Sequence, residues 1–274
     1  MPAPHELDPT RSPRALLGAE LRKYRKLAKL SQEELAEKIN FSAGMISFTE
    51  RAARMPSREL IELCEKALGL DGELLRLWPL VTMEAAPQWF QHWIEIEPDA
   101  VTLRTWEPLL VPGLLQTEDY ARALLTRTRG MTEQQVEEAV TARMTRQRIF
   151  DREVPPMFWV VIDEGVLCRP LGDKEMMRRQ LEHLIEMADR PLVTIQVVPL
   201  NSCAAAGLLG GFVIAQLSGQ PDTVYIESVA QGYVTSKHEE VMPVVIAYEV
   251  IRADALSVSA SLELIKEKME TLWT

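Results

Sequence analysis

Apolar side chains recur at helical spacing through the first 80 residues, and capping residues mark where each helix begins. Residues 14–28 carry apolar positions three and four apart, which predicts a helix with one buried face. Ser31 and Glu34 form the S-x-x-E pattern of a capping box at the head of a second helix. Further start and stop signals stand at Ser42, Ser57, Gly69, Asp71 and Pro79. The pattern predicts an all-α domain of five short helices over residues 14–80, whose last helix begins at Asp71 and is stopped by Pro79.

Beyond residue 80 the pattern changes to a mixture of helices and strands. β-branched and apolar runs predict strands at 157–162, 192–198, 212–217 and 223–228. Helical spacing or capping residues predict helices at 83–96, from Thr117, at 132–151, from Asp173, at 238–253 and at 261–273. The helical crossover between the first two strands predicts a parallel pair, and the short turn between the last two predicts an antiparallel pair. The fold class is α+β overall: a disordered arm at 1–13, the helical domain, and a mixed α+β domain with a small sheet over 85–274.

The second and third helices, residues 31–51, are both short and are separated by a tight turn. This is the helix-turn-helix layout, which places its second helix in a DNA major groove. A helical wheel turns Ile46, Thr49 and Glu50 of that helix inward. Gly44, Ser47, Phe48 and Arg51 face outward, with Ala43 and Met45 on the shoulders. The predicted DNA-binding residues are Gln32, Ser42, Ala43, Gly44, Met45, Ser47, Phe48, Arg51 and Arg54.

The outward face has few of the long polar side chains that discriminate bases by paired hydrogen bonds. Direct readout would then depend on thymine methyl contacts by Phe48 or Ala43, on the Ser47 hydroxyl and on Arg51 at the far end. We therefore expect phosphate contacts and DNA shape to carry much of the specificity. The alternative is a motif that packs against protein instead of DNA. Unchanged operator affinity in both Ser47→Ala and Phe48→Ala would exclude the recognition-helix assignment.

Charge is divided unequally along the chain. The 274 residues carry a net charge of −10; residues 1–80 hold 13 basic and 12 acidic side chains, and residues 81–274 hold 17 and 28. An acidic second domain is repelled by DNA and left free for other partners. Five basic residues precede the capping box on one helix, at Arg22, Lys23, Arg25, Lys26 and Lys29. A solvated helix face would also explain them, but their position beside a helix-turn-helix favours DNA.

Several other functional classes lack support in the sequence. No apolar run reaches the roughly 20 residues of a membrane span, and we expect no secretory signal. Three widely separated cysteines, Cys64, Cys168 and Cys203, predict a reducing, cytoplasmic location. The glycines of 207–211 run into a strand and do not form a phosphate loop, Asp163 and Glu164 read as a helix start, and a catalytic role for Cys203 is remote. We expect no metal, no cofactor and no enzymatic activity.

The helical domain resembles the Xre/Cro/C1 family of regulators over residues 16–78. The resemblance rests on LRKYRKLAKLSQEELA, ISFTER and PSRELIELCEKALGL. It implies that Gln32 opens the second helix and grips a DNA phosphate. It also implies a buried pair, Arg25 with Glu50, that ties the first helix to the recognition helix. Plain helix capping is compatible with the same residues, because capping and phosphate binding use the same helix N-termini.

The rest of the chain, roughly 85–273, resembles actinobacterial WhiJ-type, antitoxin-like regulators. The shared segments are VPGLLQTEDYARALL, ARMTRQ, VVIDEGVL, RRQLEHLIEMA, VTIQVVPL, GGFVIAQL and VYIES. The resemblance implies a small partner protein, encoded nearby, that binds the regulator. The chain departs from these relatives at 202–206, SCAAA, where they usually carry Gly and His.

These observations predict a cytoplasmic DNA-binding regulator that works as a homodimer on double-stranded DNA, without a membrane. Its acidic domain would bind the small protein, which would modulate DNA binding. The alternative from another class is a one-component regulator whose C-terminal domain senses an apolar small molecule.

Overall fold

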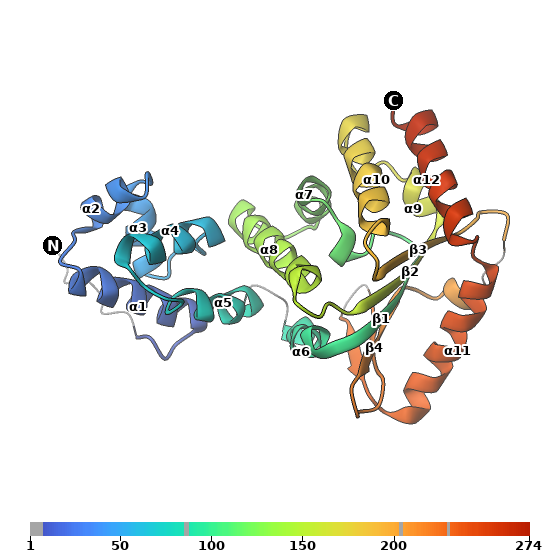
Figure 1. Cartoon of the computed structure of the whole chain (residues 1–274), viewed down its shortest axis with the longest axis horizontal. Coiled ribbons are helices and arrows are strands. Elements are labelled where there is room, and N and C mark those ends of the chain that lie inside the picture. The colour runs from blue at the N-terminus through green and yellow to red at the C-terminus, as the bar shows by residue number, and fades with distance from the viewer. Residues whose placement is uncertain (1–7, 85–87, 203–204, 229–230) are drawn as a thin grey trace. The chain divides into compact units, whose positions relative to one another are not determined.

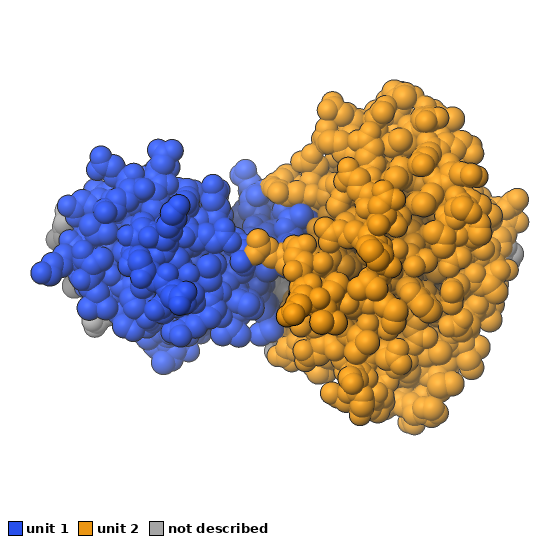
Figure 2. All heavy atoms as spheres, viewed as in Figure 1, with its two compact units in different colours: residues 1–87, 132–145 blue, residues 88–131, 146–274 orange. Residues whose placement is uncertain are grey.

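The computed structural model describes residues 8–84, 88–202, 205–228 and 231–274 of the chain. It separates into two compact units, coloured blue and orange in Figure 2. Unit 1 comprises Met1–Pro87 and Thr132–Thr145, and unit 2 comprises Gln88–Met131 and Arg146–Thr274. The predicted arm at 1–13 lies outside the described residues as far as residue 7, and Ser12 already caps the first helix.

Unit 1 is helical. Its elements are α1 (Pro13–Leu27), α2 (Gln32–Lys38), α3 (Ala43–Glu50), α4 (Arg58–Leu68), the 3-10 helix η1 (Leu75–Leu77), α5 (Trp78–Glu84) and α8 (Glu133–Arg146). The capping residues predicted at Ser31, Ser42 and Ser57 are confirmed, since each hydroxyl accepts a backbone N–H three residues on. Gly69 ends α4 at φ 66°, in the left-handed region. Local sequence signals therefore define these helices.

The prediction that the last helix begins at Asp71 and is stopped by Pro79 is wrong. The chain forms η1 and then begins α5 at Trp78, so Pro79 is the second residue of a helix. A proline is tolerated in the first turn because its missing N–H would have no helical partner there. The turn before η1 is held by the buried Glu65 carboxylate, which accepts backbone N–H groups of Gly72 and Leu74 at 3.1 and 2.6 Å.

The predicted division assigned all of 85–274 to one domain, whereas the structure places Thr132–Thr145 in unit 1. Long-range polar contacts account for this. Glu138 of α8 forms a two-bond ion pair with Arg14 of α1 at 2.9 and 3.1 Å. The Trp78 indole N–H donates to the Thr145 hydroxyl at 3.3 Å. A segment from the middle of the chain therefore completes the N-terminal unit.

Unit 2 contains a six-stranded sheet with the order β3-β2-β1-β4-β5-β6. The strands are β1 (Ala100–Glu107), β2 (Met157–Asp163), β3 (Val193–Val198), β4 (Phe212–Leu217), β5 (Thr223–Ile226) and β6 (Tyr233–Thr235). The four predicted strands are confirmed, as are the parallel pairing of β2 with β3 and the antiparallel pairing of β4 with β5. The sequence prediction missed β1 and β6, and β1 is the central strand where the parallel and antiparallel halves meet.

Helices cover both faces of this sheet (Figure 1). One face packs Leu103 and Ile195 with Leu181 of α10 and Ile265 of α12, and the other packs Trp106 with residues of α11. The helical elements of unit 2 are α6 (Gln88–Ile96), η2 (Glu97–Asp99), η3 (Gly113–Leu115), α7 (Glu118–Thr126), η4 (Gln147–Asp151), α9 (Glu164–Cys168), α10 (Lys174–Ala188), η5 (Ala205–Gly207), α11 (His238–Asp254) and α12 (Val258–Leu272). The α+β class is confirmed. No helix in the described part of the chain is both long and apolar enough to cross a membrane.

Candidate nucleic-acid interface

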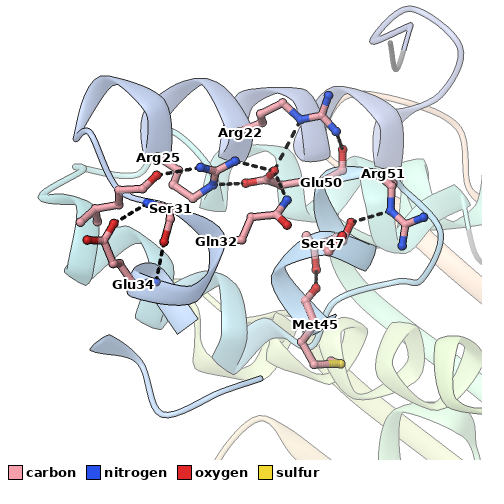
Figure 3. Close-up of polar contacts among 11 residues, drawn as sticks. Arg22, Arg25, Ser31, Gln32, Glu34, Met45, Ser47, Glu50 and Arg51 are labelled. Carbon is pink, nitrogen blue, oxygen red and sulfur yellow. Dashed lines mark hydrogen bonds and ion pairs between the residues drawn. The ribbon is translucent and has the colours of Figure 1, made fainter. Parts of the chain in front are cut away.

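The head of α2 is closed by a complete capping box. The Glu34 N–H donates to the Ser31 hydroxyl at 3.0 Å, and the Ser31 N–H donates to the Glu34 carboxylate at 2.7 Å (Figure 3). The turn to α3 passes through Asn40, whose φ of 57° lies in the left-handed region that asparagine tolerates. Ser42 then caps α3 by accepting the Met45 N–H at 3.3 Å. Residues 31–50 thus form a helix-turn-helix whose two helix starts are fixed by side chains.

The carboxylate of Glu50 is fully buried at the end of α3 and joins three segments. Arg25 of α1 donates to both carboxylate oxygens at 2.5 and 2.9 Å, and these hydrogen bonds raise the pKa of Arg25. Gln32 at the start of α2 donates its amide to the same carboxylate at 2.7 Å. Arg22 adds a bond to the Glu50 carbonyl oxygen at 3.2 Å (Figure 3). A buried carboxylate is expensive unless it is paired in this way, so the network fixes α3 against α1 and α2.

The resemblance implies that Gln32 binds a DNA phosphate, and the structure shows which group its side chain contacts. In the structure its amide group belongs to the Glu50 network. The nearest exposed basic side chains that precede α2 in sequence are Lys26, on the last turn of α1, and Lys29, in the loop after it. Lys23, in the same helix, pairs with Glu20 at 2.9 Å. The charge available to phosphates beside α2 therefore includes Lys26 and Lys29.

Burial along α3 agrees with the helical wheel. Ile46, Thr49 and Glu50 are buried. Gly44, Phe48 and Arg51 are exposed, whereas Ala43, Met45 and Ser47 are half-buried. Ser42 and, in the loop after the helix, Arg54 are exposed as well. The predicted DNA-binding residues are thus all at least partly exposed, although Ala43 and Met45 also pack against the core of unit 1.

Phe48 and Arg51 form a contact on this outward face. The Arg51 guanidinium carbon lies 5.3 Å from the centre of the Phe48 ring, a cation–π geometry. The Arg51 Nε also donates to the Ser47 carbonyl oxygen at 3.2 Å (Figure 3). The longest side chain of the face is therefore held in place at the C-terminal end of α3.

Sequence reasoning missed Gly18, which controls how closely α1 and α3 pack. A Cβ on Gly18 would lie 2.5 Å from the Thr49 carbonyl oxygen, closer than real Cβ contacts. Only glycine permits this approach without displacing α3. The signal available in the sequence was a glycine inside a strongly amphipathic helix, which usually has a packing reason.

The loop that follows α3 also contacts α8. The Gln134 amide donates to the Ala53 carbonyl oxygen at 3.4 Å and to Glu138 at 2.9 Å. Glu138 is the partner of Arg14, so α8 is linked within unit 1 both to α1 and to the segment directly after the recognition helix. No local sequence pattern marks this link, because it joins residues 81 positions apart.

The remaining candidate catalytic and metal-binding residues that the structure describes have structural roles or do not cluster. Asp163 caps α9 by accepting the Gly165 N–H, and Glu164 pairs with Lys268 at 2.7 Å, so the acid pair serves a helix start as predicted. Cys203 lies outside the described residues. Among the residues that are described, no three His, Cys, Asp or Glu side chains gather as a metal site requires.

Comparison with protein families finds two matches, a shorter one near the N-terminus and a longer one over most of the remaining chain. A helix-turn-helix domain family matches residues 16–78. A family described as a domain of unknown function, DUF5753, matches residues 90–267. The second match includes α8, which the structure places in unit 1. No curated protein and no solved structure matches the chain.

Proposed function

The chain belongs to the DUF5753 family, and from its helix-turn-helix domain we propose that it is a sequence-specific transcriptional regulator of the Xre type. The single observation that carries the proposal is the Glu50 network, which ties α3 to α1 and α2 and leaves the opposite side of α3 facing solvent. An α-helix with its side chains is about 10–12 Å across, which fits a major groove about 12 Å wide. The scaffold therefore presents α3 in the form that groove binding needs.

Phosphate contacts would position α3 on the duplex. The exposed Lys26 and Lys29 at the end of α1 and Arg54 after α3 flank the helix-turn-helix in sequence. Such contacts orient a protein without reading sequence, and the small outward side chains of α3 leave DNA shape a large share of the selectivity. A single short helix reads only a few base pairs, so the regulator would act as a homodimer on two half-sites.

The DUF5753 region would provide control. Its part in unit 2 is acidic, with 24 Asp and Glu against 16 Lys and Arg in Gln88–Met131 and Arg146–Thr274, which disfavours contact with DNA. The WhiJ-type resemblance suggests that a small protein, encoded nearby, binds there in an antitoxin-like arrangement. The regulator would have no enzymatic activity and would work in the cytoplasm, where it meets the DNA it binds.

Helix α8 offers a route from that region to the DNA-binding surface. It belongs to the matched residues 90–267, yet its Gln134 bonds to Ala53 and its Glu138 to Arg14. A partner that alters the segments flanking α8 would change how firmly α8 holds the loop after α3. Such a change alters DNA affinity only if the partner binds the two states of α8 with different affinity.

Selection of duplexes from a random library with the full-length chain tests the DNA-binding part. We expect enrichment of one sequence, and Ser47→Ala or Phe48→Ala should weaken binding to it, while Leu200→Ala, an exposed residue of unit 2, should not. The proposal would be refuted if no sequence were enriched, or if both α3 variants bound the selected duplex as tightly as the wild type does.

The control part is tested by co-expression with the neighbouring small protein, followed by gel filtration and titration with the selected duplex. A complex whose DNA affinity differs from that of the chain alone supports the proposal. Failure to form a complex would refute the proposed partner. The variant Gln134→Ala tests the role of α8. If α8 transmits the effect, the partner should change the DNA affinity of this variant less than it changes that of the wild type.

A further inference from the structure

The outward face of α3 is divided into a small-residue end and a large-residue end. Ala43, Gly44 and Ser47 have side chains too short to reach far into a groove, and a Cβ added to Gly44 would make only ordinary contacts. Phe48 is 43% exposed, and Arg51, just beyond the end of the helix, is exposed too. Base-reading chemistry is therefore concentrated in the last turn of the helix.

The other long polar side chains near α3 are already engaged. The Gln32 amide donates to Glu50, and Arg22 donates to the Glu50 carbonyl oxygen. Recruiting Gln32 for base contact would take a donor from the buried Glu50 carboxylate, and recruiting Arg22 would break its bond to the carbonyl oxygen and its 3.5 Å ion pair with the same carboxylate; either change costs free energy. Arg51 lies outside that network and contacts the Ser47 carbonyl oxygen and the Phe48 ring.

The position of Arg51 is suited to recognition. Its Nε donates to the Ser47 carbonyl oxygen at 3.2 Å, and its guanidinium lies over the Phe48 ring at 5.3 Å. These contacts use Nε and one face of the group, and they leave the two Nη atoms for a ligand. Holding a flexible side chain in advance reduces the entropy lost on binding. The two residues therefore act as one preformed unit.

The chemistry of this unit identifies its target. Two parallel N–H donors from a guanidinium match O6 and N7 of guanine, and an exposed aromatic ring matches the C5-methyl group of thymine. The separation of 5.3 Å between guanidinium and ring is more than one base-pair step of roughly 3.4 Å but less than two steps, so both groups can reach neighbouring pairs. On the basis of the proposed DNA-binding function, we propose that Phe48 and Arg51 together read a T·A pair directly beside a G·C pair in each half-site.

Base analogues test the proposal without altering the protein. A duplex is first selected with the full-length chain, and then uracil replaces each thymine and 7-deazaguanine replaces each guanine, one position at a time. We expect one guanine at which loss of N7 weakens binding about tenfold, and an adjacent thymine at which loss of the methyl weakens it several-fold. Arg51→Ala should abolish the penalty at that guanine, and Phe48→Ala should abolish the penalty at the thymine and reduce the one at the guanine.

Arg54→Ala provides the matched control, because it removes an exposed arginine from the same surface but not from the pair. It should weaken binding to all sequences alike, as loss of a phosphate contact does. This inference would be overturned if wild type and Arg51→Ala selected the same sequence, or if the guanine and thymine at which binding is lost were not adjacent. Either result would leave the regulator assignment standing. Failure of the wild type to select any sequence would overturn both.

Discussion

A Cβ on Gly18 of α1 would stand 2.5 Å from the carbonyl oxygen of Thr49 in α3. The backbone of α3 therefore packs directly against the backbone of α1. The distance between the two helices is this short because Gly18 has no side chain. This contact and the Glu50 network both join α1 to the C-terminal end of α3, which makes the orientation of α3 sensitive to single substitutions in α1.

Gly18→Ala should destabilise unit 1 by about 1–3 kcal/mol, because the added methyl group forces α1 and α3 apart. Urea unfolding followed by circular dichroism would measure the change. Gly44→Ala is the matched control, since its Cβ meets only ordinary contacts; there the better helix propensity of alanine should raise stability by up to about 1 kcal/mol. Equal effects at the two sites would contradict the packing argument.

Glu50→Gln should lower the free energy of unfolding by about 3–5 kcal/mol, because it leaves the buried Arg25 guanidinium without its counter-charge. Arg25 is only 8% exposed and cannot turn to water without moving α1. Glu59→Gln, the same change at an exposed position of α4, should alter stability by less than about 0.5 kcal/mol. Denaturant titration of the three proteins gives the comparison, and a small loss in Glu50→Gln would argue that the network is dispensable.

Alkaline pH should destabilise the protein through Cys64. Burial raises the pKa of this thiol from 9.0 to about 12, so between these values the unfolded chain loses a proton that the folded chain keeps. Unfolding is then favoured as pH rises above 9, by about 1.4 kcal/mol at pH 10.

Unfolding free energies of wild type and Cys64→Ala, measured from pH 8 to pH 10.5, isolate this effect from other titrating groups. The two curves should converge as pH rises, because alanine does not ionise. Parallel curves over that range would show that the buried thiol does not contribute.

The Arg14–Glu138 pair should couple α8 to α1 by about 1–3 kcal/mol in a double-mutant cycle. Its two side chains are 16% and 13% exposed and share two hydrogen bonds. The exposed pair Arg58–Glu62 within α4 is the control, for which about 0.3–0.5 kcal/mol is expected. A coupling no larger than the control's would mean that α8 is held by other contacts.

Much of unit 1 could be read from the sequence because its signals are local. Ser31, Ser42 and Ser57 cap the helices that follow them, and the spacing of apolar residues gives the buried faces of α1, α3 and α4. Each of these signals acts within one or two turns of the helix it controls. The misplaced end at Pro79 has the same origin, because a proline signals both the first turn of a helix and the stop of the preceding one.

Strand β1 shows why the fold of unit 2 was harder to predict from the sequence. Its Thr102 and Arg104 interrupt the apolar run that marks the predicted strands, and Arg104 is accommodated by partners far along the chain, above all Asp222, 118 residues away, at 2.8 Å. The central place of β1 depends on pairing with β2 and β4, which no local pattern encodes.

By itself, the sequence determined the helix-turn-helix, its capped helix starts, the inward and outward sides of α3 and the α+β class. The tertiary structure alone decided that Gln32 bonds to Glu50, that Arg51 lies over Phe48, and that α8 joins the N-terminal unit through Arg14 and Ala53. The reason is physical. Helix propensity and capping are set by neighbours in the chain, whereas the partner of a polar side chain is set by which distant residues packing brings within about 3 Å.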